Sequence, residues 1–388
     1  MSAVANECGN LWPSPAQELL LKAALDGDGR AVDHYLAWRE RIDLEAEFDR
    51  GSYRLLPLLY DTIARRGHDD RLMGRLKGTY RRTWCETQTR LQQAAEILRL
   101  FRAAGIETLV IKGLPLAVGI YRNPTLRPMS DLDVVVRRAR AVEAIRLLEA
   151  HGWKRGPTAR DDDVTYHHAM QFFHPAGGEV DLHWQALMDC PGAQAEAWFW
   201  EHAQEVQVKD VATLAPDATG LLLQTIIHGV RWNIEPPIRW IADATMILGR
   251  GREPVDWQRL LAFAADQRLT WRLGLGLSHL AERFQQPIPA AVLADLRRRR
   301  PSLVERIENT IALTNADRLY QHLLLMNWVI FARYCRLQQA RNPLQFINGF
   351  SHFLRVKWQL EGRSQLPAAI ATGLLRRLRR PAPTVSPQ

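Results

Sequence analysis

The spacing of apolar residues predicts helices over the first quarter of the chain. Apolar positions recur every three to four residues in segments at 14–25, 31–41, 55–65 and 71–104, the period of a helix with one buried face. Ser14 and Pro15 have the residue types that cap and begin a helix, and Gly105 follows the last segment as a terminating glycine. We therefore expect an N-terminal helical region over residues 1–104.

Shorter apolar runs that are rich in β-branched residues predict strands over the next hundred residues. These runs lie at 106–111, 133–136, 165–174 and 179–184. Two glycines and a proline in the stretch 175–178 separate the last two runs, which is typical of a hairpin. We expect an α+β core over residues 105–205, with a small mixed sheet and helices at 114–121 and 139–151.

Helical patterns return from about residue 193 and continue for most of the remaining chain. The segments 218–230 and 238–248 are apolar enough to be buried, and prolines separate the later helices. The run from Leu323 to Phe331 is too short to span a bilayer and is expected in the core of this half. We predict a C-terminal helical domain over 206–370 and a basic, disordered tail over 371–388.

Composition excludes several classes of protein. With 47% hydrophobic and 24% charged residues, the 388-residue chain is of the ordinary globular kind. The four cysteines are scattered, which argues against a zinc site or a disulfide framework. The sequence shows no secretory signal and no transmembrane segment, so we expect a cytoplasmic protein.

The net charge of +9 raises the question of a polyanionic partner. Arginines gather at 297–300 and at 376–380, and such clusters favour RNA or acidic lipid. We favour the simpler interpretation that they form solvated helix faces and a soluble tail.

Two acidic residues directly before the valine run are the first candidate for chemistry. Asp131 and Asp133 are two residues apart, so on a strand they point to the same side, with Cα atoms about 6–7 Å apart. Two carboxylates on one side of a buried strand are costly without a cation between them, and oxygen ligands suit Mg²⁺ or Mn²⁺. The alternative is that both acids lie at the strand's entrance and face solvent.

Further residues favour a phosphoryl-transfer site with two metal ions. Asp181 lies in the middle of a neighbouring strand, where it could bind metal and accept a proton from an attacking hydroxyl. His183 shares its face and could contact substrate, or it could simply be a hydrogen-bonded histidine at a strand end. Lys112 and Gly113 end the first strand and precede a helix start, a place where phosphate can bind.

These residues, taken in order, resemble a known family. Lys112-Gly113, the stretch Arg127-Pro-Met-Ser-Asp-Leu-Asp133 and the stretch Val180-Asp-Leu-His-Trp184 resemble the uncharacterised nucleotidyltransferase family of the polymerase-β-like superfamily. The segments 227–230 and 238–243 resemble the family's helical motifs more weakly. The Lys-Gly turn replaces the superfamily's usual Gly-Ser.

The resemblance implies roles for individual residues. The metal ligands and catalytic residues would be Asp131, Asp133 and Asp181. The residues that bind substrate or phosphate would be Lys112, Gly113, Arg127, Ser130, His183, His228 and Asp243. For Arg127 we expect contact with phosphate or with Asp131. For Asp243 the alternative is an ion pair with Arg239 on a helix surface.

The expected activity is therefore a metal-dependent transfer of a nucleoside monophosphate from an NTP, with release of pyrophosphate. The resemblance implies a bacterial setting and an acceptor that is a small molecule, saccharide, peptide or protein. No residue selects ATP over the other nucleotides. The alternatives are a non-catalytic nucleotide-binding module of the same fold, or an RNA-directed nucleotidyltransferase or RNA binder.

Overall fold

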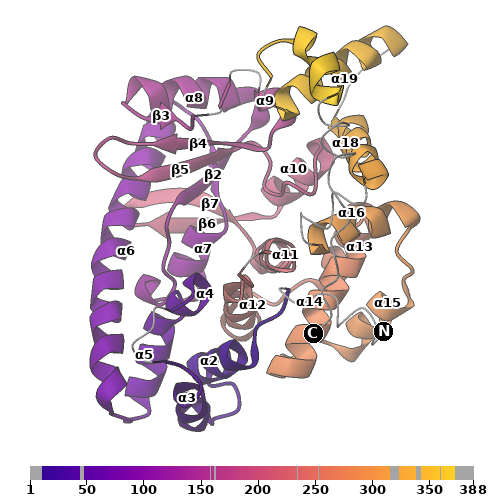
Figure 1. The fold of residues 1–388 in the computed structure, drawn as a ribbon. Coiled ribbons are helices and arrows are strands. Elements are labelled where there is room, and N and C mark those ends of the chain that lie inside the picture. Colours follow the sequence, from indigo (N-terminus) through magenta and orange to yellow (C-terminus); the bar gives the residue numbers. More distant parts are fainter. Residues whose placement is uncertain are drawn as a thin grey trace.

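The computed structural model describes residues 11–43, 48–157, 159–160, 163–233, 235–251, 253–314, 323–337, 342–358 and 360–371. A seven-stranded mixed sheet lies at the centre, and helices that precede and follow it in sequence pack around it (Figure 1). The α+β prediction is confirmed. The predicted tail lies almost wholly outside the described residues.

The N-terminal region is helical, as predicted. Its helices are α2 (Pro15–Leu25), α3 (Ala31–Arg39), α4 (Arg50–Tyr53), α5 (Leu56–Arg65) and α6 (Arg71–Ala103). Ser14 accepts a hydrogen bond from the Gln17 amide, and the Gln17 side chain accepts one from the Ser14 amide, so both free N–H groups are satisfied. Gly105 follows α6 with φ +65°, the left-handed conformation that glycine adopts without strain.

The sheet contains the four predicted strands and three more. In spatial order it comprises β3 (Lys154–Arg155), β4 (Ala169–Phe173), β5 (Glu179–His183), β2 (Leu132–Val136), β1 (Thr108–Val110), β7 (Val211–Pro216) and β6 (Ala203–Val208). The hairpin of β4 and β5 is confirmed. However, β4 begins later than expected, because its predicted first residues form the short helix α9 (Asp163–Tyr166).

The prediction that the chain is helical from residue 193 onward is wrong for residues 203–216. Only α10 (Ala193–Glu201) precedes β6 and β7, which form an antiparallel hairpin. β7 then pairs in parallel with β1 and extends the sheet. The predicted boundary between residues 205 and 206 therefore falls inside a strand of the core.

The two faces of the sheet are covered by different helices. Val134 and Val136 of β2 pack with α6 and with α8 (Ala141–Ala150), while Val135 packs into the cluster formed by the N-terminal and C-terminal helices. Since successive strand residues alternate between faces, Asp133 lies on the same face as Val135. The candidate acids therefore face the helices that come from the two ends of the chain.

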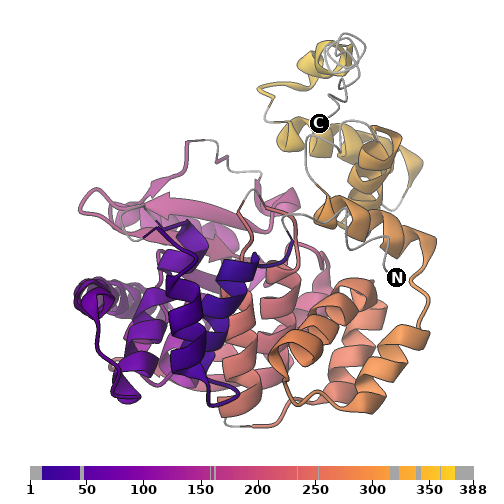
Figure 2. The ribbon, with the colours of Figure 1, turned by 60° about the horizontal axis from the view of Figure 1, so that its bottom comes forward.

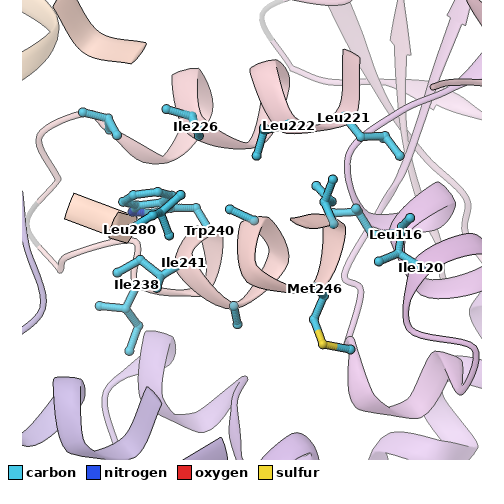
Figure 3. Packing of buried hydrophobic residues seen from close by; sticks show 14 of the residues in the cluster. Leu116, Ile120, Leu221, Leu222, Ile226, Ile238, Trp240, Ile241, Met246 and Leu280 are labelled. Carbon is cyan, nitrogen blue, oxygen red and sulfur yellow. The ribbon is translucent and has the colours of Figure 1, made fainter. Parts of the chain in front are cut away.

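Two helices of the C-terminal region carry most of the packing on that face. They are α11 (Ala218–Gly229) and α12 (Arg239–Arg250), which lie side by side next to the helical segment η1 (Leu116–Ile120) (Figure 3). The buried apolar cluster that these elements share includes Leu116, Ile120, Leu221, Leu222, Ile226, Trp240, Ile241 and Met246. This cluster fixes the position of α11 and α12 relative to the turn that follows β1.

The remaining helices extend away from the sheet. They are α13 (Trp257–Asp266), α14 (Thr270–Phe284), α15 (Ala290–Arg298), α16 (Leu303–Leu313), α18 (Leu323–Leu337) and α19 (Pro343–Lys357), and Figure 2 shows α18 and α19 at the edge of the molecule. The prediction that Leu323 to Phe331 forms a core is wrong at Trp328 and Phe331, which are 37% and 42% exposed. Within the described residues, no helix is both long and apolar enough to cross a membrane.

Close packing between α11 and α12 leads to a stability prediction. A Cβ on Gly229 would lie 2.1 Å from Cγ of the buried Trp240, so Gly229→Ala should destabilise the protein by about 1–3 kcal/mol through overpacking. The free energy of unfolding from denaturant titration measures the loss. Gly249→Ala is the matched control, because a Cβ there has no atom within 4 Å, and this helical change should be neutral or stabilising. Equal stability of the two variants would contradict the packing described for α11 and α12.

Candidate active site

The pairing of β2 with β5 brings two aspartates together. These strands are parallel neighbours, and their register sets Asp133 opposite Asp181 and Val135 opposite His183. All three polar side chains consequently lie on the same face of the sheet as Val135, the face that α11 and α12 cover. One ligand atom from each of Asp133, Asp181 and His183 lies within 4.8 Å of the other two.

The two carboxylates have different electrostatic environments. Burial alone would raise the pKa of Asp133, but a hydrogen bond with His183 Nε2 at 3.0 Å and the ammonium of Lys112 on the same oxygen hold that pKa well below its usual range. Burial raises the pKa of Asp181; His183 opposes this, while the charges of Asp133 and Asp131 add to it. Asp133 is therefore firmly ionised, and Asp181 is the more basic group.

The donor set fits a divalent cation. Ligand atoms bound to one ion at about 2.0–2.2 Å lie at most about 4.4 Å apart, so small side-chain rotations would bring all three atoms of this group onto one ion. Carboxylates suit Mg²⁺ and Mn²⁺, while imidazole extends the range to softer metals. Nδ1 of His183 is buried without a hydrogen-bond partner among the described residues.

Asp131 is not a member of this group. It precedes β2, accepts a hydrogen bond from Ser130 Oγ at 3.1 Å and lines a small recess beside Glu179. Ser130 in turn lies 3.5 Å from a guanidinium nitrogen of Arg54. Of the three predicted ligands, the structure brings Asp133 and Asp181 together, and His183 lies where Asp131 was expected. The role of Asp131 stays a prediction.

Lys112 is held in a strained conformation between a helix and the acid pair. Its φ is +54° and its ψ is −108°, an uncommon region for a residue with a side chain. Its amide donates to Gln224 Oε1 of α11 at 3.0 Å, and Gln224 donates to the carbonyl of Ala186 at 2.9 Å. Gln224 was not among the predicted site residues; a polar residue within an otherwise apolar helix is the signal that could have identified it.

Arg127 contacts Asp243 rather than Asp131. Its Nε and Nη2 donate to the Asp243 carboxylate at 3.2 and 2.8 Å, and the Tyr121 hydroxyl donates to the same group at 2.9 Å. Asp243 is buried, and Arg239 donates instead to the carbonyl of Pro128 at 2.7 Å. Both the expected contact of Arg127 with Asp131 and the alternative of a surface pair between Asp243 and Arg239 are therefore wrong.

The remaining nitrogen of Arg127 explains the glycine at position 113. A Cβ on Gly113 would lie 2.8 Å from Arg127 Nη1, so only glycine leaves room for the guanidinium. Gly113 begins the short helix α7 (Gly113–Pro115), which runs into η1. Because the Asp243 carboxylate accepts hydrogen bonds from Nε and Nη2, Nη1 is the guanidinium nitrogen that remains to donate to a ligand at this turn.

A cavity of about 760 Å³ opens beside these residues. The predicted residues Lys112, Arg127, His228 and Asp243 all line it. Four arginines line it as well. Arg239 was expected only as a surface partner of Asp243, while Arg50, Arg54 and Arg231 lie outside the recognised motifs and were not predicted. Among the described residues that line it, six side chains are cationic and two are acidic, Glu235 and Asp243, and Arg127 neutralises the second.

His228 faces this cavity as a neutral group. Desolvation by the surrounding protein, together with the charges of Lys112 and Arg231, lowers the pKa of His228 to about 4. At neutral pH it can therefore accept or donate a hydrogen bond without adding charge.

Comparisons with known proteins identify the family of this chain. Residues 52–285 match the family described as uncharacterised nucleotidyltransferase. A crystal structure of an antigenic nucleotidyltransferase-like protein from Paracoccidioides brasiliensis is 13% identical, and the alignment covers 53% of this chain and 97% of that one with a TM-score of 0.35. The comparison with curated proteins gave no match. Because the family match spans more than half of the chain, from α4 to the end of α14, and includes Asp133, Asp181 and the turn at Lys112, this protein belongs to the uncharacterised nucleotidyltransferase family.

Proposed function

We propose that this protein is a metal-dependent nucleotidyltransferase that transfers a nucleoside monophosphate from an NTP to an acceptor and releases pyrophosphate. One observation carries the proposal: Asp133, Asp181 and His183 converge within 4.8 Å, next to a cavity lined by six cationic side chains. A polyphosphate with its cation needs this combination of acidic and basic groups.

In this proposal the acidic side chains bind the metal ion and the basic side chains bind the triphosphate. Asp133 and Asp181 would hold Mg²⁺ or Mn²⁺, completed by His183 or Asp131, and such an ion polarises the reacting phosphoryl group and stabilises the leaving oxygen. Lys112 and Nη1 of Arg127 bind the triphosphate at the turn. Asp181, whose pKa is raised, accepts the proton of the attacking hydroxyl.

Two alternative functions predict different experimental results. A non-catalytic module of this fold would bind Mg·NTP and release no pyrophosphate. An RNA-directed protein would bind RNA with an affinity that falls steeply with salt. The exposed arginines at 297–300 give that second alternative little support, because Arg297 and Arg299 form ion pairs with Glu282 and Asp295.

The acid pair provides the first test of the proposal. Asp133→Asn should lower metal-dependent pyrophosphate release, measured with a mixture of candidate acceptors, by at least about 100-fold, since changes next to metal ligands alone cost about 10–100-fold. Calorimetric titration should show weaker binding of Mg·NTP. Asp210→Asn is the control, because Asp210 lies at an exposed turn and pairs only with Arg99 among the described residues.

Two outcomes would contradict the proposal. Wild-type protein that binds no NTP with Mg²⁺ or Mn²⁺ would exclude nucleotidyl transfer at this site. Asp133→Asn with unchanged pyrophosphate release and an intact fold by circular dichroism would show that the chemistry lies elsewhere.

Arg127 provides a second test, at the phosphate-binding turn. Arg127→Lys keeps the charge but cannot contact Asp243 and the turn together, so the affinity for Mg·NTP should fall about tenfold, the value of one charge-assisted hydrogen bond. Tyr121→Phe removes a different hydrogen bond to Asp243 and should leave that affinity within about twofold. If the two variants bind Mg·NTP equally well in calorimetry, Arg127 has no role in phosphate binding.

A further inference from the structure

A second cavity lies next to the first and has its own cluster of charges. Its volume is about 190 Å³, and Arg231 lines both cavities. Its wall comes from the segment after β5, from α14 and α16, and from α18. The charged residues that line it are Asp189, Arg231, Arg268, Arg272, Glu308, Arg333 and Arg336.

Positive charge in this cavity exceeds what its acids neutralise. Asp189 accepts from Arg272 at 2.7 Å and lies 3.3 Å from Arg231, and these arginines hold its pKa down to about 2 although burial alone would raise it. Arg268 and Glu308 form a pair at 3.4 Å. Among the described residues that line the cavity, five guanidinium groups share two carboxylates, which leaves an excess of three positive charges.

Arg333 differs from the other four arginines of this cavity in its interactions. Among the residues that the structure describes, none forms a hydrogen bond or an ion pair with it, whereas Arg336 donates to Gln267 Oε1 at 2.8 Å. Burial lowers the pKa of Arg333, and the charge of Asp189 opposes this only in part. A partly buried cation in a cavity with excess positive charge is stabilised by an anion bound beside it.

The second cavity is connected to the acid pair through the first cavity. Arg231 lines both cavities, and Lys112, which lines the first, contacts Asp133. The first cavity contains the triphosphate-binding groups Lys112 and Arg127, so an anion in the second cavity belongs to a different ligand.

We propose that the second cavity binds the phosphate or carboxylate group of the acceptor, so that the acceptor is an anionic molecule. The inference rests on the proposed function. In the reaction, an acceptor hydroxyl oxygen forms a bond to the α-phosphorus while the bond from that phosphorus to the bridging oxygen breaks. Pyrophosphate leaves with the electron pair, and the hydroxyl proton passes to Asp181. Arg333 and Arg231 hold the acidic group of the acceptor away from the reacting oxygen.

Inorganic phosphate is the probe for this subsite. In calorimetry with Mg²⁺ and a saturating non-hydrolysable NTP analogue, wild-type protein should bind one phosphate per chain. Arg333→Met should weaken phosphate binding at least tenfold and change the affinity for the NTP analogue less than twofold. Arg297→Met, at an exposed arginine on α15, is the matched control and should change neither affinity.

Each result bears on either the subsite or the proposed function. Phosphate that is displaced by the NTP analogue, or that binds Arg333→Met as well as wild type, would overturn the subsite while leaving metal-dependent nucleotide binding intact.

In the assay with candidate acceptors, phosphate should inhibit pyrophosphate release by wild type and inhibit Arg333→Met at least tenfold less. Phosphate that binds without inhibiting would show that the cavity does not receive the acceptor. Arg333→Lys should retain part of the binding, which excludes unfolding as the cause.

Discussion

The parallel register between β2 and β5 is the constraint on which the site depends. It sets Asp133 opposite Asp181, and because side chains alternate faces along a strand, both carboxylates lie on the face covered by α11 and α12 rather than on the face covered by α6 and α8. A shift by one residue would move the acids into the apolar layer that holds Val134 and Leu182. The valines and leucines on that opposite face therefore fix the geometry of the acids as firmly as the acids' own contacts do.

The C-terminal helices are part of the site as well as of the fold. Gln224 of α11 holds the backbone of Lys112, and Asp243 of α12 holds the guanidinium of Arg127. Both contacts span more than a hundred residues of sequence, and both depend on the packing between α11, α12 and η1. The sheet supplies the acids, the helices position the cations, and neither part forms the cavity alone.

The sequence predicted the parts of the site that local patterns determine. A two-residue alternation placed Asp181 and His183 on one face of their strand, and the turn at Lys112 followed from the end of an apolar run. The same alternation paired Asp131 with Asp133, but Asp131 precedes β2 and lies outside the group of ligand atoms. The hairpin of β6 and β7 was missed because its two-residue turn, Lys209-Asp210, contains no glycine or asparagine, although Lys209 adopts φ +54°. The partners of Arg127 were missed because nothing local distinguishes a buried aspartate in α12 from a surface one.

The contact between Lys112 and Asp133 has a consequence for how the pocket fills. An ammonium group already contacts the Asp133 oxygen that a cation would use, so it offsets part of the repulsion between Asp133 and Asp181. A metal ion at Asp133 would compete with this internal counter-charge, which would weaken binding of the bare ion. A polyphosphate that drew the lysine away would relieve that competition, so in the proposed reaction the two ligands would favour each other's binding.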